Sequence, residues 1–310
     1  MALERQTIRA VVRPEQAGLR LDHFIAADAG ELSRGMAKKL IDLGAVHLNN
    51  RRVRKCSLVL REHDSVVINI DGLSMTIFVL DDAHVVYQDK HLLVVNKPAG
   101  VDSQPTPSRF KGTLYAAVSD YLKNPLRKDL KPTIGMVQRL DRDTSGLMVF
   151  SIHPAAHKGL TRAFTQRKVT KTYRALVSGE INKNEGEFRS LLARKHSTNL
   201  MKSVERGGQE AITRFRKLAS NEYLTYVEVE IPTGRSHQIR AHFSEAGYPL
   251  LGDTRYGGPA TLDGLVLERQ MLHACALTLT HPITEDKLDF SLELPYDMDA
   301  VIHHFFSKEL

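Results

Sequence analysis

Residues 138–150 hold the side chains best suited to chemistry in this chain of 310 residues. They read Gln-Arg-Leu-Asp-Arg-Asp-Thr-Ser-Gly-Leu-Met-Val-Phe, so the carboxylate of Asp141 lies among cations and hydroxyls, just before an apolar run typical of a buried strand. A carboxylate held by such neighbours stays ionised and oriented. It suits a nucleophile or a base, although a solvated turn with an incidental ion pair would contain the same residues.

The order Arg-Leu-Asp-x-x-Thr-Ser-Gly resembles the central motif of the RluA family of pseudouridine synthases. Three further segments look like motifs of that family: Lys97-Pro98-Ala99-Gly100, Lys171-Thr172-Tyr173, and the run Gly-Arg-Ser-His-Gln-Ile-Arg-Ala-His over residues 234–242. Later segments resemble its remaining landmarks, namely Gly252-Asp253, Tyr256-Gly257, His273-Ala274 and His281-Pro282. The chain departs from the family pattern at Gln138, where the family commonly has His.

The resemblance implies an RNA-modifying isomerase that turns uridine into pseudouridine and needs no cofactor. It implies that Asp141 is the catalytic carboxylate, which either attacks C1′ of the ribose or removes a proton from C2′. Arg240 is the expected ion-pair partner of this carboxylate, with Arg235 as the alternative. Tyr173 would supply an aromatic face for the uracil and a phenol for the final proton removal from C5.

The same resemblance suggests substrate-binding residues around this centre. A stacked uridine must flip out before it reacts, and Arg139 would then occupy the vacated space in the stack. Lys97 is expected to contact phosphate or to support the pocket, although a purely structural turn is equally consistent with its motif. The remaining expected substrate-binding residues come from a single segment: Arg235, His237 and Gln238.

The balance of 43 Lys and Arg against 36 Asp and Glu gives a net charge of +7, which favours a polyanionic partner. Two basic clusters, over residues 34–55 and 158–174, favour RNA or DNA. Two cysteines are too few for a disulfide framework or a four-thiolate zinc site, so no metal is expected. The N-terminal residues lack the apolar stretch of a secretory signal and no run suits a membrane span, so we expect a cytoplasmic protein without membrane contact. We also expect a monomer.

The elements that must position these residues begin with a basic helix over about residues 34–43, which Ser33 can cap and Gly44 can end. The surrounding residues 14–72 look like an S4 RNA-binding domain with a small α/β fold. Its expected RNA-binding residues share a polar or cationic side chain: Arg20, Ser33, Arg34, Lys38, Lys39, Arg51 and Arg52. Residues 73–83 have no clear period and are expected to be a linker.

Residues 84–298 are expected to form the catalytic domain. Residues 85–95 read as a hairpin, Thr113 can open a helix, and further helices are expected over about residues 155–167 and 239–246. Apolar and polar residues alternate over 227–231 and 288–294, as in strands with one wet face. These patterns predict the α+β class, with a largely antiparallel mixed sheet and peripheral helices.

Parts of the sequence also resemble three other classes of protein: a phosphotransferase, a metal hydrolase and a non-catalytic RNA-binding protein. Asp141-Arg142-Asp143-Thr144 resembles an Asp-x-Asp phosphotransferase motif, but no apolar strand precedes it. A metal hydrolase could be built on four histidines, His237, His242, His273 and His281, yet the first two are five residues apart and therefore off a shared helix face. A non-catalytic RNA-binding protein would not need Asp141, Tyr173 and Arg240 together. Within the enzyme reading, ribosomal RNA is the favoured substrate because structured RNA offers surface to a second domain, and transfer RNA is the alternative.

Overall fold

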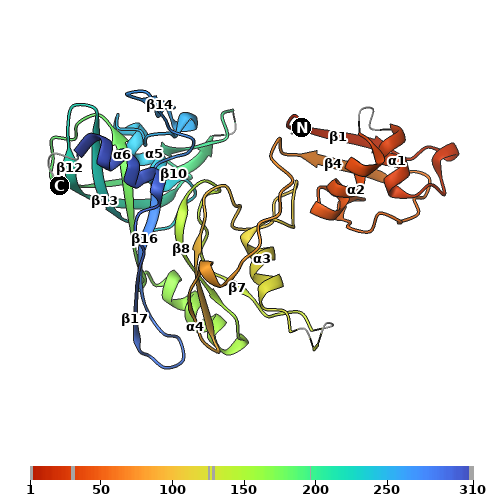
Figure 1. Ribbon diagram of the computed structural model, residues 1–310, viewed down its shortest axis with the longest axis horizontal. Helices are drawn as coiled ribbons and strands as arrows, with labels where there is room; N and C mark the ends of the chain where they lie inside the picture. The colour runs from red at the N-terminus through yellow and green to blue at the C-terminus, as the bar shows by residue number, and fades with distance from the viewer. Residues whose placement is uncertain (1–2, 29–31, 125, 128–129, 196, 307–310) are drawn as a thin grey trace. The chain divides into compact units, whose positions relative to one another are not determined.

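The computed structural model describes residues 3–28, 32–124, 126–127, 130–195 and 197–306, and the chain divides into two compact units (Figure 1). The first unit comprises Met1–Leu80 and Val101–Lys131, and the second comprises Asp81–Gly100 and Pro132–Leu310. No helix in these described ranges has the length and the apolar character needed to cross a bilayer.

The first unit is built on a four-stranded antiparallel sheet in the order β1-β4-β2-β3. The strands are β1 (Gln6–Val11), β2 (Val46–Leu48), β3 (Arg51–Arg52) and β4 (Ser65–Ile70), and two helices, α1 (Leu21–Asp28) and α2 (Arg34–Leu43), precede β2. Leu21, Phe24 and Ile41 from the helices pack with Val46 and Ile68 from the strands, which gives this small unit a core of its own.

Helix α2 has the bounds that its sequence predicts. The Ser33 hydroxyl accepts a hydrogen bond from the Met36 amide, and Gly44 ends the helix with a left-handed φ of 89°. Ala37, Leu40 and Ile41 are buried, whereas Lys38 and Lys39 are exposed. The helix is therefore anchored by one apolar side and presents its cations to solvent.

The segment from Val101 to Lys131 returns to the first unit and includes helix α3 (Leu114–Tyr121), which Thr113 caps as expected. Arg109 donates two hydrogen bonds to the carboxylate of Asp71, at 2.7 and 2.9 Å, and Lys111 pairs with Asp42 of α2 at 2.6 Å. The expected domains had placed this segment, with the rest of residues 84–298, in the catalytic domain. Those domain limits stay a prediction, and the contacts of Arg109 and Lys111 join this segment to the N-terminal residues.

The second unit is organised around one large sheet, whose main path runs β11-β10-β12-β13-β9-β16-β8-β6-β5. Strand β17 pairs with β16, and β7 pairs with β8. The strands are β5 (Val85–Gln88), β6 (Leu92–Lys97), β7 (Gly135–Met136), β8 (Ser145–Ser151), β9 (Thr170–Ser178), β10 (Glu185–Lys195), β11 (Leu200–Val204), β12 (Gln209–Ser220), β13 (Leu224–Glu230), β16 (Leu272–Thr280) and β17 (Lys287–Ser291).

Its strand pairs are antiparallel except at one position, where β16 runs parallel to β8. This confirms the α+β class with a largely antiparallel sheet. Strand β8 is buried along its whole length, as its unbroken apolar run requires, whereas β13 and β17 alternate between inner and outer side chains. The continuous run therefore marks an interior strand that is covered on both faces.

Three helices and a small hairpin complete the second unit. Helix α4 (Pro154–Thr165) packs Ala156 and Leu160 against Leu147 and Val149 of β8. Helix α5 (Gln238–Glu245) follows the loop after β13, and helix α6 (Tyr296–Phe306) buries Met298 and Phe306 near the end of the chain. The hairpin is formed by β14 (Thr261–Leu262) and β15 (Leu265–Val266). Figure 1 shows α5 and α6 beside the strands of the same sheet.

Candidate active site

Asp141 lies in the loop between β7 and β8, shortly before the fully buried strand β8. Gly146, the second residue of β8, has a φ of 117° and pairs with Ala274 of the parallel strand β16. A Cβ atom at Gly146 would lie 2.3 Å from the Ala274 carbonyl oxygen, so glycine alone allows the two backbones to approach. The close pairing of β8 with β16 therefore fixes the end of the loop that carries Asp141.

Arg240 in α5 joins two carboxylates. Its Nη1 donates to Asp141 Oδ2 at 2.9 Å, while its Nε and Nη2 donate to Asp253 at 2.6 and 2.8 Å. Burial alone lowers the pKa of Arg240, but the hydrogen bonds and charges of the two carboxylates outweigh it and raise that pKa above its usual range. A guanidinium held by Asp253 on one side can thus orient Asp141 on the other without losing its charge.

His237, the residue before α5, lies close to the same carboxylate. Its Nε2 is 3.9 Å from Asp141 Oδ1, and its Nδ1 is 2.9 Å from the hydroxyl of Tyr256. Burial lowers the pKa of His237 to about 4, although the negative charge of Asp141 acts in the opposite direction. The ring is therefore neutral at pH 7, and it borders Asp141 without forming an ion pair with it.

Tyr173 in β9 is buried, with only 6% of its surface exposed. Burial raises the pKa of its phenol, and the charge of Asp141 raises it further, so Tyr173 lies within electrostatic range of Asp141. The phenol consequently stays protonated at neutral pH.

Several buried side chains hold the Asp141 loop in place. The guanidinium of Arg269 donates to the Asp143 carbonyl at 3.1 Å and forms two hydrogen bonds with Asp297 of α6, and Gln270 Nε2 donates to the Thr144 hydroxyl at 3.2 Å. Gln138, at the position of the usual His, donates to the Leu147 carbonyl at 3.4 Å. The loop is thus held on both sides of Asp141 by hydrogen bonds to its backbone and hydroxyls.

Lys97 and Gln238 are enclosed in this structure, and their substrate-binding role stays a prediction. Lys97 is fully buried, and its ammonium donates to the Pro98 and Arg142 carbonyls at 2.8 Å. Gln238 is 3% exposed, and its amide oxygen and nitrogen are hydrogen bonded to four groups. Buried polar groups that are hydrogen bonded within the protein support the pocket around them.

Arg139 and Arg235 remain accessible near this centre. Arg139 is exposed, and its Nη2 donates to the Ser236 hydroxyl. The Nε of Arg235 donates to the Glu210 carbonyl at 2.9 Å. The ion-pair position on Asp141 belongs to Arg240, so Arg235 is not the partner that the alternative expected.

Sequence reasoning missed Asp253, Tyr256 and Arg269 as parts of the site. Asp253 is 2% exposed and binds Arg240, and the Arg240 guanidinium also lies 4.9 Å from the centroid of the Tyr256 ring. Gly252-Asp253 and Tyr256-Gly257 had been noted as landmarks without a role. An aspartate beside a glycine, between apolar segments, was the available signal, but nothing local showed which arginine it binds.

The expected RNA-binding residues lie in the first unit and differ in their surroundings. Arg20 and Arg34 both pair with the buried carboxylate of Asp22 at 3.0 Å, and the Ser33 hydroxyl caps α2. Burial would raise the pKa of Asp22, but the hydrogen bonds and charges of the two arginines lower it to about 2. Arg20 and Arg34 are still exposed.

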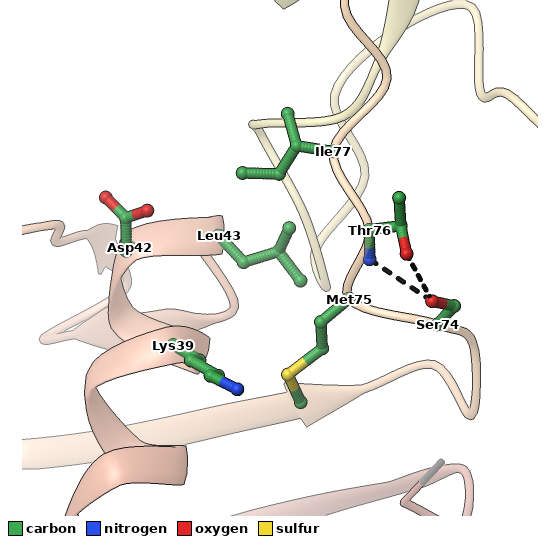
Figure 2. Close-up of a pocket in the computed structure, with 7 residues that line it drawn as sticks. All are labelled: Lys39, Asp42, Leu43, Ser74, Met75, Thr76 and Ile77. Carbon is green, nitrogen blue, oxygen red and sulfur yellow. Dashed lines mark hydrogen bonds between the residues drawn. The ribbon is translucent and has the colours of Figure 1, made fainter. Parts of the chain in front are cut away.

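Lys38, Lys39 and Arg51 are exposed, whereas Arg52 is half-buried and donates to the Thr106 carbonyl. Lys39 lines a cavity within the first unit, between α2 and the residues after β4 (Figure 2). The other lining residues are Asp42, Leu43, Ser74, Met75, Thr76 and Ile77. This cavity contains none of the residues around Asp141. The two exposed lysines and Arg51 are therefore the members of the expected set that are most open to a polyanion.

The histidines of the hydrolase alternative do not gather at one point. His242 bonds with Thr213 and Ser190, and His273 bonds with Ser145. Among the described residues, one group of side chains has the arrangement needed to hold a metal ion. It consists of Asp89, His91 and His281, near the start of β6. The His281 Nδ1 accepts two backbone N–H bonds, so its Nε2 carries the proton and faces Asp89 at 3.0 Å. A protonated Nε2 is a donor and not a metal ligand.

Comparison with known families identifies two regions of the chain. Residues 91–245 match the model of a family described as RNA pseudouridylate synthase, and residues 19–66 match the S4 domain. The first match contains Asp141, Tyr173 and Arg240, and the second contains α2 and β2. The S4 match confirms the small N-terminal domain expected from the sequence.

Characterised and uncharacterised relatives align along nearly the whole chain. An uncharacterised RNA pseudouridine synthase of Aquifex aeolicus is 34% identical over 91% of this chain and 92% of the relative. A ribosomal large subunit pseudouridine synthase D of Haemophilus influenzae is 33% identical over 96% and 94%. Among solved structures, human RNA pseudouridylate synthase domain containing 4 is 25% identical, with a TM-score of 0.59 over 71% of this chain and 92% of that chain.

Proposed function

The chain belongs to the RNA pseudouridylate synthase family, and from this premise we propose that it isomerises specific uridines of structured ribosomal RNA. The enzyme class follows from the family, and the S4 domain adds a second RNA-binding unit. Support for ribosomal RNA comes from relatives of Zymomonas mobilis and Haemophilus influenzae that are named ribosomal large subunit pseudouridine synthase D. Each is 33% identical to this chain.

The observation that carries the proposal is the hydrogen-bonded series Asp253–Arg240–Asp141 beside Tyr173. Isomerisation breaks the bond between ribose C1′ and base N1, rotates the uracil and forms a bond from C1′ to C5. The proton leaves C5, N1 gains a proton, and no group or electron is exchanged with another molecule. A carboxylate at the sugar, a fixed cation beside it and a wall for the detached base are what this reaction requires.

In this proposal Asp141 is the catalytic carboxylate and Arg240 is its ion-pair partner. The two roles given to Asp141, attack on C1′ and removal of a proton from C2′, both need an oriented carboxylate at the sugar. Because the Tyr173 phenol stays protonated, its raised pKa supports the role of an aromatic wall for the uracil more than that of a base. His237, neutral and close to Asp141, borders the same space.

The substrate is tested by mapping pseudouridine in total RNA from cells with and without the gene. Carbodiimide-induced stops of reverse transcription should disappear from ribosomal RNA in cells without the gene and return when the gene is supplied. Loss of stops from transfer RNA alone would establish the alternative substrate and refute the ribosomal one.

The role of Asp141 is tested by Asp141→Asn, which retains the shape of the side chain and removes its charge. We expect the variant to fold and to bind RNA, because Asp141 is partly exposed and is not part of the apolar core. Tritium release from RNA labelled at uridine C5 should fall by at least about a thousandfold, the usual range for loss of an essential catalytic group. Turnover within tenfold of the wild type would contradict the assignment.

A further inference from the structure

Lys171 is a cation near the candidate active site that the proposed reaction has not yet used. It lies in β9 two residues before Tyr173, so the two side chains project from the same face of the strand, about 7 Å apart. Lys171 is partly buried, and its ammonium is 6.0 Å from the centroid of the Phe164 ring in α4. The side chain therefore lies on the same face of the sheet as Tyr173 and reaches toward α4.

The surroundings of Lys171 are cationic. Its ammonium lies beside Gly234, since a Cβ atom at that glycine would be 3.7 Å away, and the neighbouring charge is that of Arg235. Burial lowers the pKa of Lys171 to about 8, and the charge of Arg235 lowers it further. Within the described ranges, neither side chain has a carboxylate at ion-pair distance. The charge of Arg235 also acts on Glu210, but that carboxylate pairs with Arg167 at 2.9 Å and with Arg189 at 3.2 Å. Two adjacent cations with no carboxylate in ion-pair contact among the described residues favour an anion between them.

The loop after β13 connects this cationic place to Asp141. Gly234 lies at Lys171, Ser236 accepts a hydrogen bond from Arg139, and His237 faces Asp141. Consecutive residues span at most about 3.6 Å each, so the three steps from Gly234 to His237 cover at most roughly 11 Å. The cations and the carboxylate are therefore close enough for one nucleotide to reach both.

We propose that Lys171 and Arg235 together bind a phosphate group of the substrate RNA next to the reacting uridine. The proposal rests on the proposed function, because it assumes that the uridine occupies the space between Asp141 and Tyr173. A phosphate would neutralise both cations and would hold the sugar in position against Asp141. Lys171 is then a binding residue and takes no part in proton transfer.

The test uses the full-length chain carrying Asp141→Asn, so that binding is measured without turnover. Ribosomal RNA purified from cells lacking the gene serves as the probe, and its Kd is measured at several salt concentrations with and without Lys171→Met. Loss of one phosphate contact should weaken binding severalfold and reduce the slope of log Kd against log salt by about 0.7 to 0.9. Lys171→Arg should restore most of that slope.

Lys217→Met is the matched control, because Lys217 is also a partly buried strand lysine but donates to the Ile181 carbonyl. It should leave both Kd and slope unchanged. An unchanged slope in a Lys171→Met protein with the melting temperature of its parent would overturn the proposal. An equal loss of RNA affinity in Lys171→Met and Lys217→Met would also overturn the proposal.

A second measurement uses the unsubstituted chain in case Lys171→Met does not fold. An acetylating reagent at pH 8 should modify Lys171, and bound ribosomal RNA should slow that modification at least fivefold while leaving Lys217 unaffected. Absence of protection would refute the phosphate site. Both measurements report binding alone, so a protein that protects Lys171 but never releases tritium would refute the isomerase and leave the phosphate site intact.

Discussion

At the scale of single residues, Asp253 is the part of the site with the most testable consequence. Its carboxylate holds two nitrogens of Arg240 and leaves the third to Asp141. In Asp253→Asn the amide cannot accept both hydrogen bonds, and the guanidinium loses its fixed orientation. We expect kcat to fall by about tenfold or more, which corresponds to ~1.4 kcal/mol, with little change in the Kd for RNA.

Asp71→Asn is a suitable control for this change. Asp71 accepts two hydrogen bonds from Arg109 in the same geometry, but in the first unit. It should reduce stability by a similar amount and leave kcat close to that of the wild type. If both variants lost turnover equally, a general loss of folding would account for the effect of Asp253→Asn.

Two buried histidines make stability depend on pH. Burial lowers the pKa of both His237 and His273 to about 4, with the charge of Arg269 adding to the effect at His273. Between pH 6.5 and 4 the unfolded chain therefore binds protons that the folded chain does not. The free energy of unfolding should fall as the pH is lowered through this window, and should be unaffected by these groups above pH 7.

Urea unfolding at pH 7 and pH 5 measures this dependence. His273→Asn, which can still bond with Ser145, should flatten it, whereas His63→Asn should not, because His63 is largely exposed. The same slope in wild type and His273→Asn would show that His273 is not the group responsible.

The sequence was informative about residues whose chemistry is carried by a motif and uninformative about burial. It predicted that Arg240 would lie against Asp141, which the structure shows at 2.9 Å. It also grouped Lys97 and Gln238 with the substrate, although both are enclosed. The sequence does not show whether a long polar side chain reaches solvent or bonds to a backbone carbonyl, because tertiary packing decides between the two.

At the scale of elements, the start of β8 offers a sharp test. Gly146 and Gly100 both have a positive φ, of 117° and 81°, but only Gly146 faces a backbone within 3 Å. Gly146→Ala should separate β8 from β16 and cost several kcal/mol of stability, because the carbonyl of Ala274 cannot move as a flexible side chain would. Gly100→Ala, with open space, should cost only about 1 kcal/mol.

Thermal unfolding of both alanine variants gives the comparison, and tritium release reports whether the Asp141 loop is displaced. Equal small losses would mean that the sheet accommodates a methyl group at Gly146. The expected result is a large loss of both stability and turnover at Gly146 alone.

Elements with local signals were predicted well, and elements that depend on distant partners were not. The cap, the apolar side and the terminal glycine of α2 all lie within a dozen residues, and its bounds were correct. The long strands β10 and β12 exchange hydrogen bonds with each other and not within their own segments, so their ends could not be inferred. Helix α6 was missed because its caps are weak and its packing partners lie far away in the sequence.

At the scale of the whole molecule, the expected RNA-binding surface of the first unit can be tested by charge removal. Lys38 and Lys39 are exposed cations of α2 with no carboxylate at ion-pair distance in the described residues. Replacing both with alanine should weaken binding to ribosomal RNA and reduce the salt slope by up to about 1.8, with kcat unchanged. Lys287→Ala, whose ammonium already pairs with Asp289, is the control.

Point substitutions are preferable here to removal of residues 1–72. Such a truncation would leave Arg109 and Lys111 without the carboxylates of Asp71 and Asp42. A reduced affinity would then mix lost RNA contacts with lost folding. Unchanged Kd and slope in the lysine variant would instead show that α2 does not face RNA.

The return of residues 101–131 to the first unit limits which gene segments can be exchanged between relatives by recombination. Exchange of a gene segment encoding residues 1–80 alone would deliver a domain without the segment that supplies Arg109 to Asp71 and the Phe110 ring to Arg54. A hybrid would succeed only where donor and recipient agree at these positions. The N-terminal residues 1–80 and the residues between Gly100 and Pro132 should therefore change together among descendants of this gene, although 20 residues of the second unit separate them in the sequence.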